Sequence, residues 1–155
     1  MKLHELLPKN AILLGFNPAD KADALSQMGT YMASLYDLGA PDPIVERLLQ
    51  RESEMSTGIG FGIAIPHARV DGIDRLYMVA ARTVDALEFD AIDGQPVHLI
   101  FMLLTPTNTA SDHSRILATL SKIMSYEEVR TSLQTSESAE RFLDVLINGE
   151  DKYVP

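Results

Sequence analysis

The sequence predicts a mixed α/β (α+β) domain in which helices cover a mixed sheet. Three observations support this. Apolar residues recur at helical spacing in the first third, strand-like runs punctuated by glycine and proline fill the middle, and the last third is helical again. A chain of 155 residues can also bury a full hydrophobic core. No repeat or linker is visible, so we expect residues 1–155 to form a single domain.

A strand and a helix are expected near the N-terminus. Ala11–Leu14 is a strand-like run that follows a short apolar patch. Asp20 is a favourable N-cap, and Asp23 can complete the cap of a helix that extends to about Tyr36. The spacing of apolar residues predicts that this helix buries a face made of Leu25, Met28, Met32 and Leu35.

A second helix and a glycine-rich loop follow. Asp42 and Pro43 are typical of an N-cap and a first helical position, so we expect the helix to begin there. Alternate glycines in Ser56–Gly62 predict a loop, which leads into a short buried strand, Ile63–Ile65, stopped by Pro66. The second helix is expected to face the core with Ile44, Val45, Leu48 and Leu49.

Two strands are expected in the middle of the chain. Leu76–Arg82 has the pattern of a strand, and turns are expected at Asp85–Ala86 and at Asp93–Gly94. Val97–Leu104 is the most apolar run in the sequence. Its length and its content of Val, Ile and Phe are typical of a central strand.

The last third predicts three helices. The first is expected to start near Asp112. Ser125 and Glu128 match a capping box for a short second helix. The third is expected over residues 137–148, with Gly149 as its C′ glycine. The core-facing residues are expected to be Ile116, Leu117, Leu120, Ile123 and Met124, followed by Phe142, Val145 and Leu146.

Composition narrows the classes of function. The net charge is −9, and no run of basic residues is present, which argues against a nucleic-acid partner. The absence of cysteine excludes disulfides, zinc–thiolate sites and thiol catalysis. The longest apolar stretch, near Leu99–Leu104, is too short to span a membrane, and the first residues lack the apolar core of a secretory signal. We therefore expect a cytoplasmic protein without membrane insertion.

The glycine loop does not match the common nucleotide-binding patterns. Gly58, Gly60 and Gly62 alternate, whereas a dinucleotide site needs G-x-G-x-x-G at the start of a helix. No G-x-x-x-x-G-K-[ST] sequence occurs, so a P-loop nucleoside triphosphatase is excluded. Alternate glycines still allow backbone N–H groups to approach an anion, although such a loop is more often only a tight connection.

Among the four histidines, His67 is the leading candidate for chemistry. It directly follows Pro66, whose fixed backbone presents the imidazole from the stiff end of a strand. His113 is expected at a helix N-terminus, where the dipole keeps an imidazole neutral and favours a nearby anion. His98 lies in the apolar strand and is better explained by packing, and His4 carries no signal.

Other chemistries have less support. His67 and His113 are 46 positions apart, with no H-E-x-x-H pair and no obvious third ligand, so a metal site is unsupported. No G-x-S-x-G sequence is present, which argues against a serine hydrolase. From the residues alone, His67 is as well explained by a structural role as by a functional one.

A family resemblance separates these alternatives. Arg51–Ala68 carries the pattern R-E-x(4)-T-G-I-G-x-G-I-A-I-P-H and resembles the signature of the fructose/mannitol-type (type 2) enzyme IIA domains of the bacterial sugar phosphotransferase system, or PTS. The resemblance covers essentially the whole chain. It includes Phe89–Val97, the strand that ends with Leu104–Pro106, and His113 at the start of the next helix.

The resemblance implies a fold and a set of site residues. The family fold is a three-layer α/β/α arrangement with a mixed parallel/antiparallel sheet. His67 would accept a phosphoryl group from the phosphohistidine of HPr or an HPr-like protein, as the catalytic residue of a phosphotransferase. His113 and Arg51 would assist it, and Arg51, Ser56, Thr57 and His113 would bind phosphate. Because these groups neutralise charge, no metal or other cofactor is expected.

The resemblance leaves the role of the carrier open. The overall length and the segment Asp90–Val97 look more like the nitrogen-regulatory enzyme IIA, which controls target proteins through its phosphorylation state. The alternative is a sugar-specific enzyme IIA that donates to a IIB cysteine. Two hypotheses of other classes remain, namely a non-catalytic protein-binding module on the same fold and, with least support, a metal-dependent hydrolase.

Overall fold

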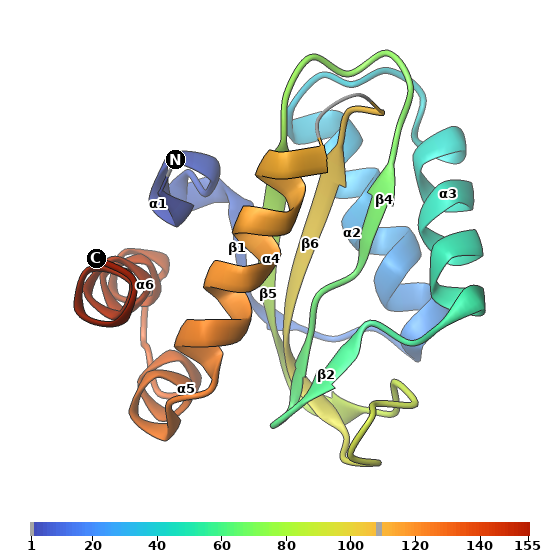
Figure 1. The fold of residues 1–155 in the computed structure, drawn as a ribbon. Helices are drawn as coiled ribbons and strands as arrows, with labels where there is room; N and C mark the ends of the chain where they lie inside the picture. The colour runs from blue at the N-terminus through green and yellow to red at the C-terminus, as the bar shows by residue number, and fades with distance from the viewer. Residues whose placement is uncertain (1, 108–109) are drawn as a thin grey trace.

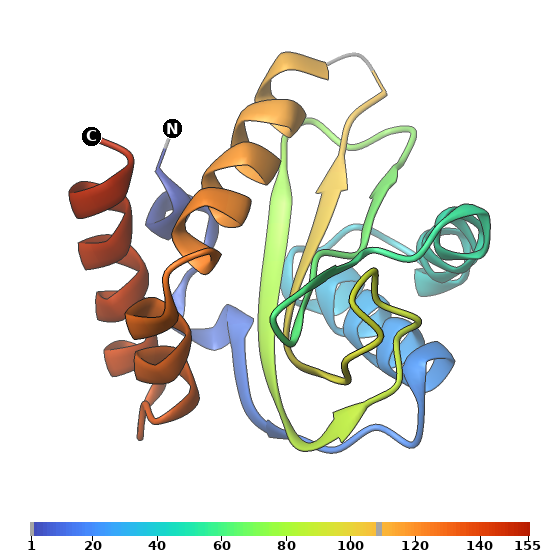
Figure 2. The ribbon, with the colours of Figure 1, turned by 60° about the horizontal axis from the view of Figure 1, so that its bottom comes forward.

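The computed structural model describes residues 2–107 and 110–155, and it has three layers (Figures 1 and 2). A mixed sheet lies between α2 and α3 on one face and α1, α4, α5 and α6 on the other. The helices are α1 (Leu3–Leu6), α2 (Lys21–Leu35), α3 (Pro41–Glu54), α4 (Ala110–Met124), α5 (Glu127–Gln134) and α6 (Ala139–Tyr153), with a 3₁₀ turn at Lys9–Ala11. The fold class predicted from the sequence is confirmed.

The sheet combines parallel and antiparallel pairs. Its strands are β1 (Ile12–Phe16), β2 (Gly58–Gly60), β3 (Ile63–Ala64), β4 (His67–Arg69), β5 (Tyr77–Leu87) and β6 (Val97–Thr105). The order is β1-β5-β6-β3-β2, and β4 also pairs with β6. β5 and β6 are antiparallel, β1 is parallel to β5, and β3 and β4 are both parallel to β6. β6 is therefore the central strand, as its apolar sequence predicts.

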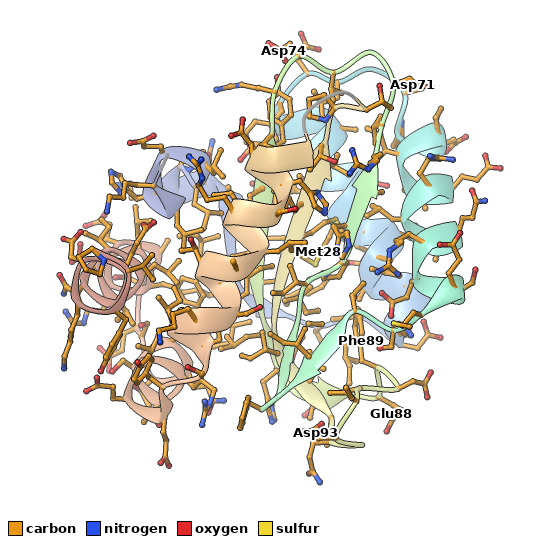
Figure 3. The ribbon with its side chains drawn as sticks, viewed as in Figure 1. Met28, Asp71, Asp74, Glu88, Phe89 and Asp93 are labelled. Atoms are coloured by element: carbon orange, nitrogen blue, oxygen red, sulfur yellow. The ribbon has the colours of Figure 1, made fainter. Side chains whose placement is uncertain are left out.

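The hydrophobic core lies on both faces of β5 and β6. Helices cover both faces, so the strands are buried on both sides and need continuous apolar residues. The predicted apolar face of α2 packs here, and Met28, labelled near the centre of Figure 3, is fully buried. Asp20 caps α2 as expected, because its side chain accepts a hydrogen bond from the Asp23 N–H at 2.8 Å.

The start of α3 differs from the prediction. The helix begins at Pro41 with Ala40 as N-cap, two residues before the expected first residue Pro43 and N-cap Asp42. A proline is compatible with the first helical turn, and Pro41 therefore allows the helix to start earlier. Leu49, expected to face inward, is instead 37% exposed, because the apolar stripe of α3 is narrow and centred on Ile44 and Leu48.

The middle strands are longer than expected. β5 continues through Asp85–Ala86 to Leu87, so the expected turn there is wrong. Leu87 pairs with Val97 of β6 after an irregularity in register, and this pairing keeps the segment extended. The turn at Asp93–Gly94 is confirmed, since the Gly94 N–H donates to the Ala91 carbonyl at 2.9 Å. Gly58–Gly60, expected as loop, forms the short edge strand β2.

Two helix boundaries near the C-terminus also differ. Tyr126 is the N-cap of α5, and the Ser125 hydroxyl donates to the Lys122 carbonyl instead of forming a capping box with Glu128. α6 continues past Gly149 to Tyr153. Gly149 packs against α5, where an added Cβ would lie 3.4 Å from Val129. The presence of glycine at this position is therefore explained by close packing between helices and not by the end of a helix.

α4 begins at Ala110, two residues before the expected Asp112. Within the described residues, none of the helices is both long enough and apolar enough to cross a bilayer.

Candidate functional site

Three elements line an open pocket of about 230 Å³ around the candidate histidine. In Figure 1, β4 lies between α3 and α4, and these are the elements that line the pocket. The lining residues are Arg47, Gln50, Arg51 and Glu54 from α3, His67, Ala68 and Arg69 from β4, and His113 from α4. Three of the predicted site residues, His67, His113 and Arg51, therefore meet in one place.

His67 is held at the first position of β4. Pro66 separates β3 from β4, and the two short strands pair with successive parts of β6. The His67 Nδ1 lies 2.7 Å from the Ile65 carbonyl oxygen. A carbonyl only accepts hydrogen bonds, so Nδ1 carries the proton and donates it, and Nε2 retains the lone pair.

The surroundings keep the His67 imidazole neutral. Burial lowers the pKa of His67, and the positive charges of Arg51 and Arg69 lower it further. The hydrogen bond to the Ile65 carbonyl and the charge of Glu52 oppose this shift without cancelling it. A neutral imidazole with a free lone pair is a nucleophile at neutral pH.

His113 lies beside His67 in the first turn of α4. The centroids of the two rings are 5.0 Å apart, and the ring planes make an angle of 69°. Burial, followed by the charges of His67, Arg69 and Arg51, lowers the pKa of His113 to about 4. The His113 Nδ1 is buried and has no hydrogen-bond partner among the described residues. Such an atom is uncommon in a folded protein, and a bound ion or a catalytic role is among its explanations.

Arg51 brings a guanidinium to the pocket from the last turn of α3. Its Nη1 donates to the Met55 carbonyl at 2.9 Å, just beyond the end of the helix. This bond uses one of the five N–H donors of the guanidinium and fixes the direction of the side chain. The remaining donors suit an anion in the pocket.

Ser56 and Thr57, the other two predicted phosphate-binding residues, are not among the residues that line the pocket. The Ser56 hydroxyl donates to the Phe89 carbonyl at 2.6 Å. Thr57 is buried, and its hydroxyl donates to the carboxylate of Glu52. The structure therefore does not bring these two hydroxyls together with His67.

Glu52 organises the segment before β2, a role that was not anticipated from the sequence. Its side chain is buried, accepts a hydrogen bond from the Thr57 N–H at 2.9 Å and pairs with Lys21 Nζ at 2.8 Å. Lys21 Nζ also donates to the Phe89 carbonyl at 3.1 Å. We call Lys21, Glu52, Ser56, Thr57 and the Phe89 carbonyl the Glu52 cluster. The only sequence signal was the acidic residue next to Arg51.

Arg47 and Arg69 also line the pocket and were not predicted. Arg69 follows His67 by two positions on one strand, and this alternation is a signal that the sequence offered. By contrast, His98 lies in β6 and His4 in α1, and neither lines the pocket. Within residues 2–107 and 110–155, no three His, Asp or Glu side chains are placed to hold a metal ion.

Comparisons with known proteins point to one family. The model of the family "Phosphoenolpyruvate-dependent sugar phosphotransferase system, EIIA 2" matches residues 5–149. The fructose-specific EIIA component of Haloferax volcanii is 36% identical over 141 residues, which cover 91% of this chain and 92% of that protein. The fructose-specific EIIABC component of Bacillus subtilis is 36% identical over 152 residues, 98% of this chain but 24% of that longer protein.

A solved structure extends the likeness to three dimensions. The nitrogen regulatory protein IIA-Ntr from Neisseria meningitidis has a TM-score of 0.84 and 34% sequence identity, and the match covers 92% of this chain and 97% of that one. The pattern at Arg51–Ala68, the three-layer fold and the match over residues 5–149 agree. The chain belongs to the EIIA type 2 family of the phosphoenolpyruvate-dependent sugar phosphotransferase system.

Proposed function

We propose that this phosphotransferase domain carries a phosphoryl group on Nε2 of His67. The observation that carries the proposal is the hydrogen bond from His67 Nδ1 to the Ile65 carbonyl at 2.7 Å. This bond fixes the tautomer and leaves Nε2 as the nucleophilic nitrogen of a residue that lines the pocket.

In the proposed reaction, the Nε2 lone pair attacks the phosphorus of a phosphohistidine on the donor protein. A P–Nε2 bond forms as the P–N bond of the donor breaks, and the electron pair of the broken bond returns to the donor imidazole. His67 keeps its Nδ1 proton and becomes a phosphorylated imidazolium, which the Ile65 carbonyl stabilises. The reverse steps pass the group to the next acceptor.

Arg51 and His113 supply charge and orientation in this proposal. Phosphoryl transfer depends mainly on alignment and on stabilisation of charge on the phosphoryl oxygens. The free donors of the Arg51 guanidinium would bind these oxygens, and the adjacent His113 would donate an N–H from its neutral ring. Ser56 and Thr57 support the proposal only indirectly, by holding the preceding segment in place.

The proposed donor is HPr or an HPr-like protein, and the proposed location is the cytoplasm. For the downstream role we favour nitrogen-type regulation, in which the phosphorylation state controls target proteins. The likeness to IIA-Ntr, with a TM-score of 0.84, supports this choice. The second candidate is donation to a IIB cysteine for sugar uptake, which the fructose-specific relatives at 36% identity favour.

Phosphoryl transfer in vitro tests the first proposal. The purified protein is incubated with phosphorylated HPr or its nitrogen-system relative, and acid-labile phosphohistidine is measured. We expect labelling of the wild type and of the surface control His4→Ala, and none of His67→Ala. Labelling of His67→Ala at the wild-type level, or an unlabelled wild type with every donor, would refute the carrier function.

A second experiment separates the two downstream roles. The phosphorylated protein is offered to a fructose-type IIB domain, and transfer to its cysteine is followed over time. A regulatory protein is expected to transfer little and to bind other proteins differently in its two phosphorylation states. Rapid and complete transfer to IIB would instead support the transport role.

A further inference from the structure

Two arginines of the pocket, Arg47 and Arg69, have no role in the reaction proposed above. Arg47, Arg51 and Arg69 all line the pocket, in a chain whose net charge is −9. Glu54 is the one carboxylate among the lining residues. With both imidazoles neutral, the lining therefore carries a net positive charge, which suits an anion with two negative charges.

Arg69 shares a strand with the phosphoryl acceptor. β4 pairs with β6 in regular parallel register, with His67 opposite Leu103 and Arg69 opposite Thr105. In an extended strand, side chains two positions apart point to the same face. Ala68, between them, is buried and turned to the opposite face. The backbone of β4 thus presents the imidazole and the guanidinium side by side.

The charge of Arg69 reaches both histidines. It is among the causes that lower the pKa of His67 and of His113, in each case after burial. The side chain itself is exposed and forms no ion pair within the described part of the chain. Its guanidinium is therefore available to a ligand in the pocket.

Arg47 already forms a hydrogen bond within the protein. Its Nε donates to the carbonyl of Arg69 at 3.3 Å and links α3 to the end of β4. This bond involves the backbone of Arg69 and leaves the side chain of Arg69 uncommitted. Of the two arginines not assigned above, Arg69 is thus the better placed to bind an anion.

We propose that Arg69 is a second phosphoryl-binding arginine of this site and a catalytic residue of the transfer. Arg51 approaches the pocket from α3 and Arg69 from β4, so the two guanidinium groups can hold different oxygens of one phosphoryl group. The inference rests on the proposed role of His67. Arg69 forms and breaks no covalent bond and loses no proton, because its N–H groups only donate to oxygens as phosphorus moves between nitrogens.

Single-turnover transfer from the phosphorylated donor tests this role. The variants are Arg69→Gln, Arg69→Lys and the matched control Arg115→Gln, which removes an exposed arginine of α4 outside the pocket. At saturating donor, we expect Arg69→Gln to slow the transfer about 10- to 100-fold. Lysine keeps the charge without the fork and should restore part of the rate. The control should react like the wild type.

Two results would overturn the inference. One is an Arg69→Gln protein that reacts at the wild-type rate at saturating donor. The other is a change confined to the donor concentration at half-saturation, which would make Arg69 a docking residue. An NMR titration of His67 gives an independent check, because removal of a nearby positive charge is expected to raise its pKa.

The outcomes also separate this inference from the carrier function. If the wild type is labelled and His67→Ala is not, but Arg69→Gln is unimpaired, only the role of Arg69 fails. If the wild type remains unlabelled with every donor, the carrier function fails and the role of Arg69 fails with it. Circular dichroism confirms that each variant is folded, which we expect because the side chain of Arg69 is exposed.

Discussion

Two neighbouring groups of polar residues are built in opposite ways. Arg51 and Glu52 are adjacent in α3, yet Arg51 lines the open pocket and Glu52 is 6% exposed inside the Glu52 cluster. In the cluster, Glu52 is bonded to the Thr57 N–H, the Thr57 hydroxyl and Lys21. In the pocket, the buried Nδ1 of His113 has no partner in the part of the chain that is described.

The difference indicates that neighbouring residues of the family motif have different roles. Buried polar groups that are fully hydrogen-bonded stabilise one arrangement of the backbone, whereas unpaired groups retain binding capacity for a ligand. We therefore expect substitutions in the Glu52 cluster to lower stability, and substitutions in the pocket to alter transfer or pH response. Four variants test this contrast.

Glu52→Ala should have the largest effect on stability. It removes the buried partner of Lys21, which keeps Asp90 and the Phe89 carbonyl as partners. It also removes two acceptors from Thr57, so we expect a loss of about 3 kcal/mol in the free energy of unfolding. Urea denaturation measures this loss, with Glu46→Ala, an exposed glutamate of the same helix, as control. If the two variants were equally stable, the cluster would not stabilise the fold.

Gly58→Ala should have the next largest effect. A Cβ at this position would lie 2.7 Å from the Ala91 Cβ and 2.9 Å from its Cα, so the segment beside the cluster must move. Overpacking of this kind costs about 1–3 kcal/mol, measurable by urea denaturation. The additional change Ala91→Gly removes one of the two clashes and should recover part of the loss. An unchanged midpoint for Gly58→Ala would contradict the close packing.

Thr57→Val should cost less, because it removes one hydroxyl and keeps the shape. We expect a loss of about 1 kcal/mol in the free energy of unfolding, and Thr57→Ser, which keeps the hydroxyl, should lose less. The rate of phosphoryl transfer by the folded fraction should change little, since the hydroxyl already donates to Glu52. A slow transfer by Thr57→Val but not by Thr57→Ser would instead assign the hydroxyl to phosphate binding.

At neutral pH, His113→Gln should have the smallest effect on stability of the four variants, and its effect should emerge on acidification. The pKa of His113 is about 4 in the folded protein and near 6.5 when unfolded, so between these values the unfolded chain binds more protons. Stability is then lost as pH falls through this window, and His113→Gln should lose less of it than the wild type. Urea denaturation at pH 7 and pH 5 measures the difference, with the exposed His4→Gln as control. Equal acid sensitivity of His113→Gln and the wild type would contradict a neutral, partly buried imidazole.

An element is predicted correctly from the sequence where its own residues and its contacts in the fold favour the same structure. The run at Val97–Leu104 and the cap at Asp20 needed no information beyond a few neighbouring residues, and both are confirmed. The turn expected at Asp85–Ala86 is wrong because pairing with β6 overrides local turn chemistry. The expectation for Gly149 is wrong for a similar reason, since the role of this glycine is contact with Val129 on another helix.

The site depends even more on contacts between residues that are distant in the sequence. The 46 positions between His67 and His113 carry no signal that their rings lie 5.0 Å apart, and only the family resemblance linked them. The placement of Thr57 and Glu52 could not be foreseen, because whether a hydroxyl faces a pocket or a buried carboxylate depends on how α3 packs. Strand alternation from His67 to Arg69 was available in the sequence and points to the same face.

The hydrogen bond between Ile65 and His67 has a consequence for the energy of the carrier. If Nδ1 stays protonated while phosphorus is attached to Nε2, the phosphorylated ring is a cation, and it leaves as a neutral imidazole, which is a good leaving group. The phosphoryl group would thus be stored in a state ready for onward delivery. Because the acceptor is a main-chain oxygen, replacing the side chain at position 65 does not remove it, and the choice of reactive nitrogen is protected from mutation there.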